Sequence, residues 1–171
     1  MIVNLDEADV PGAVPMDYFI HDINQPRDLA VRDGLLYLVG EGNEGGNWKR
    51  FLMILDVSSL TPLTDNDTTI FIDKDDDGLV ASFIEVGNSP QTLLLTTDYV
   101  FVTNMGDDTV SVIDLAARTV VAEIDVGSEP FSLALYTTAD GVEQYVYVGN
   151  LEGNTISIID IPSLTVVTTF P

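Results

Sequence analysis

A segment of 26 residues occurs twice in the second half of this chain, and this repeat constrains the fold more than any other feature of the sequence. Residues 99–124 and 145–170 align without a gap at an offset of 46 positions, and 11 of the 26 aligned positions are identical. Each copy begins with a Tyr-Val run and continues into a Thr-apolar-Ser-apolar-Ile-Asp segment. A chain with such self-similarity is expected to fold as an array of like units.

Each unit is predicted to contain four β-strands. The first strand begins with a Pro-x-x-Leu-x-apolar pattern, which starts at Pro26, Pro90 and Pro130. The second strand is continuously apolar, which is typical of a strand covered on both faces, and the third is rich in β-branched residues. The third strand ends in an aspartate that we expect to cap the turn to a short fourth strand. These aspartates are Asp56, Asp114 and Asp160.

Four strands in a repeat of about 40 residues, without a helical period, predict an all-β fold of β-propeller type. We expect one domain over residues 1–171, with four-stranded antiparallel blades at 26–89, 90–129 and 130–171. Residues 18–21 predict an extra outer strand within the N-terminal segment 1–25. Three blades are fewer than the four to eight that close a propeller, so we expect an incomplete propeller with a bare face at each end. Further blades, other chains or copies of this chain are needed to cover those faces.

Residues 99–104 and 109–114, followed by the segment VGSEP at 126–130, resemble the YVTN-type β-propeller repeat. The resemblance covers residues 90–171 well and residues 16–89 loosely. It implies blades like those of archaeal surface-layer proteins, of secreted bacterial proteins and of propeller subunits in some periplasmic oxidoreductases. The motif carries no catalytic residues, so the resemblance implies a fold and a secreted or cell-surface setting but no reaction.

The charge balance excludes some partners. The chain has 28 acidic residues and 6 basic ones, a formal net charge of −22, which repels nucleic acid and anionic lipid. Such acidity is typical of a surface that stays soluble in salt-rich water or that meets divalent cations. No apolar run approaches the roughly 18 residues that span a bilayer, and residues 1–7 lack a secretory signal pattern. We therefore expect no nucleic-acid partner and no membrane insertion, in a protein that is intracellular or whose signal has been removed.

No residue in the sequence is predicted to be catalytic. The chain has no cysteine, which excludes disulfides, thiolate catalysis, iron–sulfur clusters and covalent haem attachment. The single histidine, His21, has no nucleophile pattern around it and is predicted to be an exposed strand residue. Residues that recur in every blade are expected to serve the blade itself. Asn104 and Asn150 are thus predicted to form turns in the left-handed conformation.

An acidic loop at residues 73–78 matches the first half of a calcium-binding loop. Carboxylates at alternate positions supply hard oxygen ligands, and Gly78 in the sixth position allows a sharp turn. The second half does not match, because Ile84 stands where a bidentate Glu is needed and no helices flank the loop. An exposed hairpin turned by Asp77 and Gly78 is the alternative. The candidate ligands are Asp73, Asp75 and Asp77, with Asp65 and Asp67 as additional ones.

The first unit differs from the others by two insertions, at residues 40–50 and 64–80, which we expect to be exposed loops. The first insertion contains a Gly-x-Gly-x-x-Gly pattern, but a strand rather than a helix follows it, which argues against dinucleotide binding. It also contains Trp48, Lys49 and Arg50, an aromatic residue with adjacent cations that could anchor an acidic partner surface. The alternative is that Trp48 caps the hydrophobic edge of its own blade.

Together these features predict a non-enzymatic β-propeller scaffold, secreted or at the cell surface, that binds protein partners or assembles with itself into an oligomer or polymer. Calcium is the candidate stabiliser. The bare end faces favour this function, because an assembly protein can use them and a self-contained enzyme could not leave them open. The alternative is an enzyme class, in which the blades belong to a larger propeller similar to lactonase-like or dehydrogenase-subunit propellers, with its site in a central channel.

Overall fold

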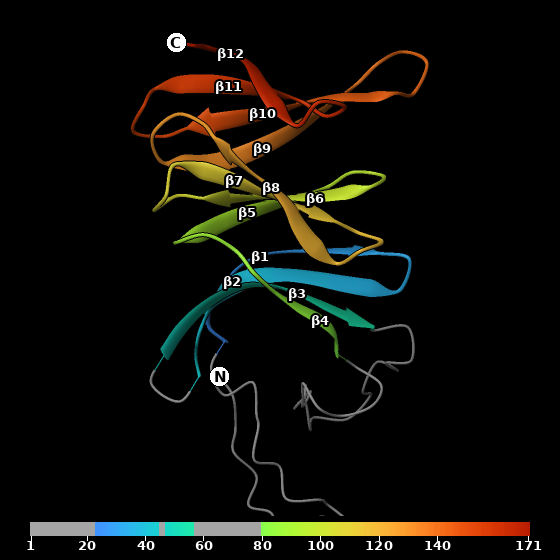
Figure 1. The fold of residues 1–171 in the computed structure, drawn as a ribbon, viewed down its shortest axis with the longest axis vertical. Helices are drawn as coiled ribbons and strands as arrows, with labels where there is room; N and C mark the ends of the chain where they lie inside the picture. The colour runs from blue at the N-terminus through green and yellow to red at the C-terminus, as the bar shows by residue number, and fades with distance from the viewer. Residues whose placement is uncertain (1–22, 45–46, 57–79) are drawn as a thin grey trace, which may run out of the picture.

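The structure, a computed structural model, describes residues 23–44, 47–56 and 80–171, which form three four-stranded antiparallel sheets (Figure 1). Each sheet is one blade, and its strands lie side by side in chain order, as predicted. Blade 1 contains β1 (Ile23–Arg32), β2 (Leu35–Glu44), β3 (Asn47–Asp56) and β4 (Val80–Glu85). Blade 2 contains β5 (Pro90–Leu95), β6 (Tyr99–Asn104), β7 (Thr109–Asp114) and β8 (Thr119–Asp125). Blade 3 contains β9 (Pro130–Thr137), β10 (Glu143–Asn150), β11 (Thr155–Asp160) and β12 (Thr165–Phe170).

The blades stack along the long axis of the molecule, with blade 2 between blades 1 and 3 (Figure 1). Their first strands are neighbours, because β1 contacts β5 and β5 contacts β9. The fourth strand of one blade leads into the first strand of the next through residues 86–89 and 126–129. Blades 1 and 3 therefore each have one face against blade 2 and one face turned away from it, which we call the far face.

The core consists of two apolar layers, one at each junction between blades. Tyr37 of blade 1 packs with Val100 and Val102 of blade 2, and Phe101 of blade 2 packs with Val146 of blade 3. All five side chains are at most 4% exposed. Because successive residues of a strand point to opposite faces, β6 contributes to both layers. This confirms, for β6, the prediction that the second strand is covered on both faces.

Aspartates cap the turns between third and fourth strands, as predicted. The Oδ1 atom of Asp114 accepts hydrogen bonds from the backbone N–H groups of Ala116 and Ala117, at 2.8 and 2.7 Å. The Oδ2 atom of Asp160 accepts one from the Ser163 N–H at 3.1 Å. These recurring carboxylates therefore stabilise blade turns.

The prediction that Asn104 and Asn150 are left-handed turn residues is wrong. The left-handed residues in these two turns are Asp108, with φ of 57°, and Asn154, with φ of 49°. Both asparagines instead end the second strand of their blade, and both are buried. Their recurring place in the repeat therefore reflects side-chain hydrogen bonding, not backbone conformation.

The Asn104 side chain joins the second strand of blade 2 to the third. Its Nδ2 donates to the Thr109 hydroxyl at 3.0 Å and to the Ser111 hydroxyl at 2.8 Å, and Ser111 donates in turn to Glu123 Oε1 at 2.6 Å. A Cβ at Gly87 would lie 2.6 Å from Asn104 Cγ, so the glycine leaves room for the amide. Blade 3 repeats the arrangement with Asn150, Thr155, Ser157, Thr169 and Gly127.

The first insertion of blade 1 extends a hairpin and is not the exposed loop that we predicted. Strand β2 runs to Glu44 and β3 begins at Asn47, and their pairing continues in register from Gly40↔Phe51 to Glu44↔Asn47. Antiparallel pairing satisfies the backbone polar groups that a loop would leave to water. The second insertion, at residues 64–80, lies outside the described residues except for Val80, which begins β4.

Candidate functional site

The predicted calcium ligands lie outside the described residues, so calcium binding stays a prediction. The same holds for His21 and for the extra strand predicted at residues 18–21. Among the described residues, no group of three or more histidine or acidic side chains is arranged to hold a metal ion. The ligands that fall in the undescribed segment 57–79 are Asp65, Asp67, Asp73, Asp75 and Asp77.

The predicted partner-binding residues lie at the start of β3, on the extended hairpin of blade 1. The Trp48 and Lys49 side chains are exposed and Arg50 is half-buried. Because side chains alternate along a strand, Trp48 and Arg50 share one face of β3 and Lys49 lies on the other. The three residues therefore do not form one continuous surface, and their role as a partner anchor stays a prediction.

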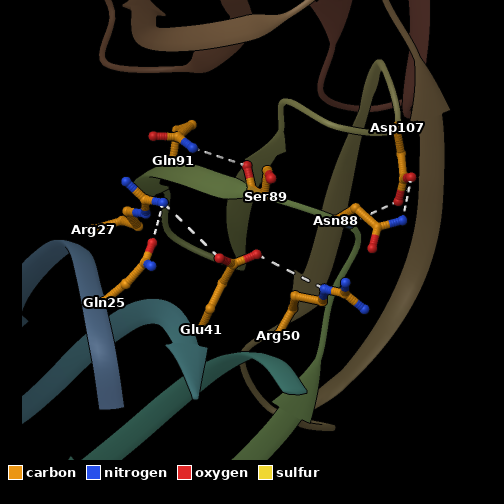
Figure 2. Close-up of polar contacts among 8 residues, drawn as sticks. All are labelled: Gln25, Arg27, Glu41, Arg50, Asn88, Ser89, Gln91 and Asp107. Carbon is orange, nitrogen blue, oxygen red and sulfur yellow. Dashed lines mark hydrogen bonds and ion pairs between the residues drawn. The ribbon is translucent and has the colours of Figure 1, made fainter. Parts of the chain in front are cut away.

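Figure 2 shows that Arg50 already has a charged neighbour within blade 1. Glu41 lies between two arginines, with its Oε2 atom 3.9 Å from Arg27 Nη2 and its Oε1 atom 3.8 Å from Arg50 Nε. The Glu41 side chain is only 15% exposed, so solvent and salt screen these pairs less than they screen a fully exposed pair. Two of the six basic residues of the chain thus pair with Glu41 and help to hold β1, β2 and β3 together.

A second polar contact joins the connection between blades 1 and 2 to the β6–β7 turn (Figure 2). The Asn88 backbone N–H donates to Asp107 Oδ2 at 2.7 Å, and the Asn88 side-chain amide donates to Oδ1. The side-chain hydrogen bond, followed by the backbone one, lowers the pKa of Asp107, and the positive charge of Arg50 lowers it further. A carboxylate held as an anion in this way suits a structural role, because a general acid or base works best with a pKa near the operating pH.

The far face of blade 1 is apolar and buried at its centre, whereas its outer strands are exposed. Strand pairing places Leu29 and Val31 of β1 and Phe83 of β4 on this face, and they are 60%, 63% and 43% exposed. Phe51, Met53 and Leu55 form a cluster on this face, with Leu36 and Leu38 packed against them. The exposed fractions of the first three are 6%, 0% and 1%. The prediction of a bare face at this end of the array is therefore wrong for the centre of the face, and the outer strands keep exposed apolar side chains. Large apolar side chains gain free energy from burial, and the three central ones are buried within the single chain.

The far face of blade 3 is apolar and open. Strand pairing and alternation place on it six large side chains from the four strands of the blade: Tyr136, Tyr145, Tyr147, Ile156, Ile158 and Phe170. Tyr136, Ile156 and Phe170 are 46%, 37% and 39% exposed, and the other three are half-buried. Tyr136 and Tyr145 stack with ring centroids 6.1 Å apart. The predicted coverage of both faces of the second strand is therefore wrong for β10.

The repeat shows what kind of surface the far face of blade 3 is. The positions of this face on β10, β11 and β12 have counterparts 46 residues earlier that face blade 3 and are packed in the junction between blades 2 and 3. The same positions of the blade are thus covered by a neighbouring sheet in blade 2 and open in blade 3. In blade 2 they are Tyr99, Phe101, Val110, Val112, Ala122 and Ile124; in blade 3 they are Tyr145, Tyr147, Ile156, Ile158, Thr168 and Phe170.

Blade 3 is also poor in charge. Residues 130–171 contain four charged residues, all acidic, whereas residues 90–129 contain eight. In the fully described strands β9–β12 the only two charged residues are Glu143 and Asp160. Glu143 accepts a hydrogen bond from the Thr97 N–H of blade 2, and Asp160 caps a turn. The centre of the far face therefore carries no charge. This scarcity was the sequence signal that could have distinguished the open end of the array from the closed one.

No protein-family model matches the chain, and no curated protein matches it. Among solved structures, the chain is similar to a chain of hydrazine synthase from Kuenenia stuttgartiensis, with a TM-score of 0.60 and 20% sequence identity over 92% of this chain and 39% of that one. It also matches apo AztD from Citrobacter koseri, with a TM-score of 0.47 and 11% identity over 85% of this chain and 46% of that one. This chain thus spans less than half the length of both.

The similarity to the hydrazine synthase chain, together with the three sheets, shows the fold class: an all-β array of β-propeller type built from four-stranded antiparallel blades. At 20% identity it shows the fold alone. Among the residues that the structure describes, none belongs to a helix that could cross a lipid bilayer.

Proposed function

We propose that this protein is a non-enzymatic β-propeller scaffold that acts by binding protein surfaces, with the far face of blade 3 as its contact surface. The observation that supports this proposal is an open apolar sheet face whose centre carries no charge, at one end of a molecule with a formal net charge of −22. Extended exposed apolar surface marks sites of interaction with proteins or membranes. The strong negative charge disfavours anionic membranes, which leaves protein as the partner.

The contacts of the described carboxylates favour a structural protein. Asp114 and Asp160 cap turns, Glu41 pairs with two arginines, and Asp107 is held by Asn88. Each of these groups is engaged in holding the blades in place. A scaffold needs such contacts, because rigid blades hold the contact surface in a fixed shape.

The setting and the stabiliser are part of the same proposal. The resemblance of residues 90–171 to the YVTN-type repeat favours a secreted or cell-surface protein. Calcium bound by Asp73, Asp75 and Asp77 would neutralise an acidic segment that otherwise repels itself, and so stabilise the second insertion of blade 1. Trp48 remains a candidate second anchor, because its ring is exposed.

A larger propeller enzyme or oxidoreductase subunit is the alternative. In that case the far face of blade 3 is covered by another blade and the reaction takes place in a channel that several blades build. The hydrazine synthase chain, of which this chain spans 39%, is an example of a longer chain with a similar fold. The two functions differ in what they require of the isolated 171-residue chain. A scaffold must bind its partner through this chain alone, whereas a larger propeller enzyme has no such requirement.

Retention of the purified chain on the surface of the cells that produce it tests the proposal. The wild-type chain and two variants are added to washed cell envelopes, and the bound fraction is measured. We expect retention of the wild type and of Val31→Glu, which changes an exposed residue on β1, and loss of retention for Ile156→Glu on the far face of blade 3. Equal retention of all three chains, or of none, contradicts the proposed contact surface.

A further inference from the structure

We propose that the far face of blade 3 binds a second copy of this chain, so that two chains form a closed dimer with far face against far face. This inference rests on the proposed function and narrows it to one partner. The residues that would meet across the dimer are those of the central row of the face, Tyr147, Ile158 and Thr168, which lie opposite one another on β10, β11 and β12.

The number of open end faces decides the type of assembly. A head-to-tail array needs two different surfaces, here the far face of blade 3 in one copy and the far face of blade 1 in the next. The centre of the second surface is already covered, because Met53 and Leu55 are 0% and 1% exposed within the single chain, and only its outer strands are open, at Leu29, Val31 and Phe83. A contact that uses the same face on both copies is isologous, and it closes after two chains. A head-to-tail contact would need the covered centre of the blade 1 face, so the structure favours a dimer over the polymer or ring that two faces with open centres would allow.

The junction between blades 2 and 3 shows that this face is built to pack against another sheet. Phe101, Val110 and Val112 are fully buried under blade 3, and Tyr147, Ile156 and Ile158 occupy the same positions one repeat later. Two such faces can stack about 10 Å apart, as the sheets of a β-sandwich do. Tyrosine suits this contact, because its ring packs against apolar groups while its hydroxyl reaches water at the rim.

The charges favour a second copy over a basic partner. Two copies that each carry a formal charge of −22 repel one another, so only a neutral surface can bring them into contact. The far face of blade 3 is neutral at its centre, in the blade with half as many charged residues as blade 2. A surface suited to a basic partner would instead keep carboxylates among its contact residues, since complementary charge fixes the register of such contacts.

The size of the face predicts a reversible dimer that salt strengthens. Four strands at about 4.8 Å spacing and six residues at about 3.4 Å give a face of roughly 19 by 20 Å. This is modest beside the roughly 800 Å² that each partner buries in a stable interface. The repulsion between the two acidic chains extends over about 10 Å at 0.1 M salt and about 3 Å at 1 M. The dimer dissociation constant should therefore fall as salt is raised.

Sedimentation velocity of the full 171-residue chain tests the proposal. The chain is measured from low micromolar to millimolar concentration, at about 0.1 M and about 1 M KCl. The screening length falls from about 10 Å to about 3 Å between these two salt concentrations. We expect the mass to rise from 18.6 kDa to twice that value and no further, at a lower concentration in the higher salt. Ile156→Glu should raise the dissociation constant by roughly 30-fold or more, because it places an unpaired charge in the contact. The matched variant Val31→Glu, on an exposed residue of β1, should dimerise like the wild type.

Single cysteines test the symmetry of the contact. The chain has no cysteine of its own, so a cysteine placed in turn at Tyr147, Ile158 and Thr168 is the only thiol in each variant. In an isologous contact a residue near the two-fold axis meets itself, and a disulfide forms when the two Cα atoms lie within about 7 Å. We expect at least one of the three variants to form covalent dimers under mild oxidation, and Val31→Cys to form none.

Three results would overturn the inference: a monomer at every concentration and salt, a mass that grows beyond the dimer, or a dimer that Ile156→Glu leaves intact. Retention on cell envelopes separates this failure from that of the proposed function. A chain that stays monomeric but is retained on envelopes through the far face binds a different occupant, such as a further blade or another protein. A chain that neither dimerises nor is retained contradicts both proposals.

Discussion

The far faces of the two end blades differ at their centres: the centre of one is buried within the single chain, and the centre of the other is in partial contact with water. The centre of the far face of blade 1 contains Phe51, Met53 and Leu55, none more than 6% exposed. The far face of blade 3 includes Ile156 and Phe170, each more than a third exposed. The difference gives the array a direction, because only one of the two far faces has an open centre.

The residue types of the two far faces differ in a way that matches the difference in burial. At the positions of Phe51 and Met53, blade 2 has the smaller polar residues Thr109 and Ser111, so blade 1 has gained apolar bulk on the side that is buried. Blade 3 instead places tyrosines on its open face, and tyrosine tolerates contact with both water and apolar surface. The residue types of an end face thus indicate whether it is closed within the chain or reserved for a contact.

Removing the same aromatic ring from a covered face and from the open face should give the largest contrast. Phe101 and Tyr147 occupy equivalent positions, but Phe101 is fully buried under blade 3. We expect Phe101→Ala to lower the free energy of unfolding by about 3–5 kcal/mol, and Tyr147→Ala by about 1 kcal/mol. Denaturant unfolding at micromolar concentration and low salt, where the chain is monomeric, measures both. Equal losses would mean that blade 3 is covered in the monomer.

The two far faces themselves can be compared with a matched pair of truncations. Met53→Ala removes a fully buried side chain from blade 1 and should lower the free energy of unfolding by about 2–5 kcal/mol. Ile156→Ala on blade 3 should lower it by less than about 1 kcal/mol in the monomer, because that side chain is already in partial contact with water. A small effect of Met53→Ala would show that the far face of blade 1 gains little from its burial.

Calcium should act on blade 1 and not on blade 3. If Asp73 and Asp75 bind calcium, a concentration of about 100 times the dissociation constant raises the free energy of unfolding by about 2.7 kcal/mol. Chelation should then lower the melting temperature, and the double substitution Asp73→Asn and Asp75→Asn should abolish the shift.

The control for the calcium measurement removes the same amount of charge from blade 3. It is the double substitution Asp140→Asn and Glu152→Gln, at two exposed residues that follow β9 and β10, and it should preserve the shift. A melting temperature that is the same with calcium and with chelator rules out the site.

The smallest effect concerns a contact that blade 2 has and blade 3 lacks. Gly153 stands in blade 3 at the position of Asp107. The pKa of Asp107 is lowered from its ordinary value of 3.8, so its contact with Asn88 stabilises the fold above that pH and is lost as the pH falls through the lower folded-state pKa. Asp107→Asn should therefore reduce the free energy of unfolding at neutral pH, by less than about 0.5 kcal/mol because the group is exposed. The difference from wild type should vanish once the pH lies below the folded-state pKa, and a difference that persists there would contradict this account.

The features that could be predicted from the sequence are those that depend on local pattern. Strand order and the Asp114 and Asp160 caps follow from the spacing of apolar and turn-forming residues within one unit. The role of Asn104 could not be predicted, because its partners Thr109 and Ser111 depend on the register of two strands. The sequence also predicted bare end faces but not that the centre of one of them is buried, since burial depends on contacts between residues far apart in the chain.

Hydroxyl-radical footprinting of the dilute, monomeric chain tests the central claim most directly, because it labels the side chains of both far faces in one sample. We expect strong labelling of Tyr136, Ile156 and Phe170 on blade 3 and almost none of Phe51 and Met53 on blade 1, after correction for the intrinsic reactivity of each residue type. At millimolar protein in high salt the blade 3 residues should become protected while exposed Leu29 and Val31 of β1 stay labelled. Labelling of Phe51 and Met53 as strong as that of Ile156 and Phe170 in the dilute chain would contradict the account.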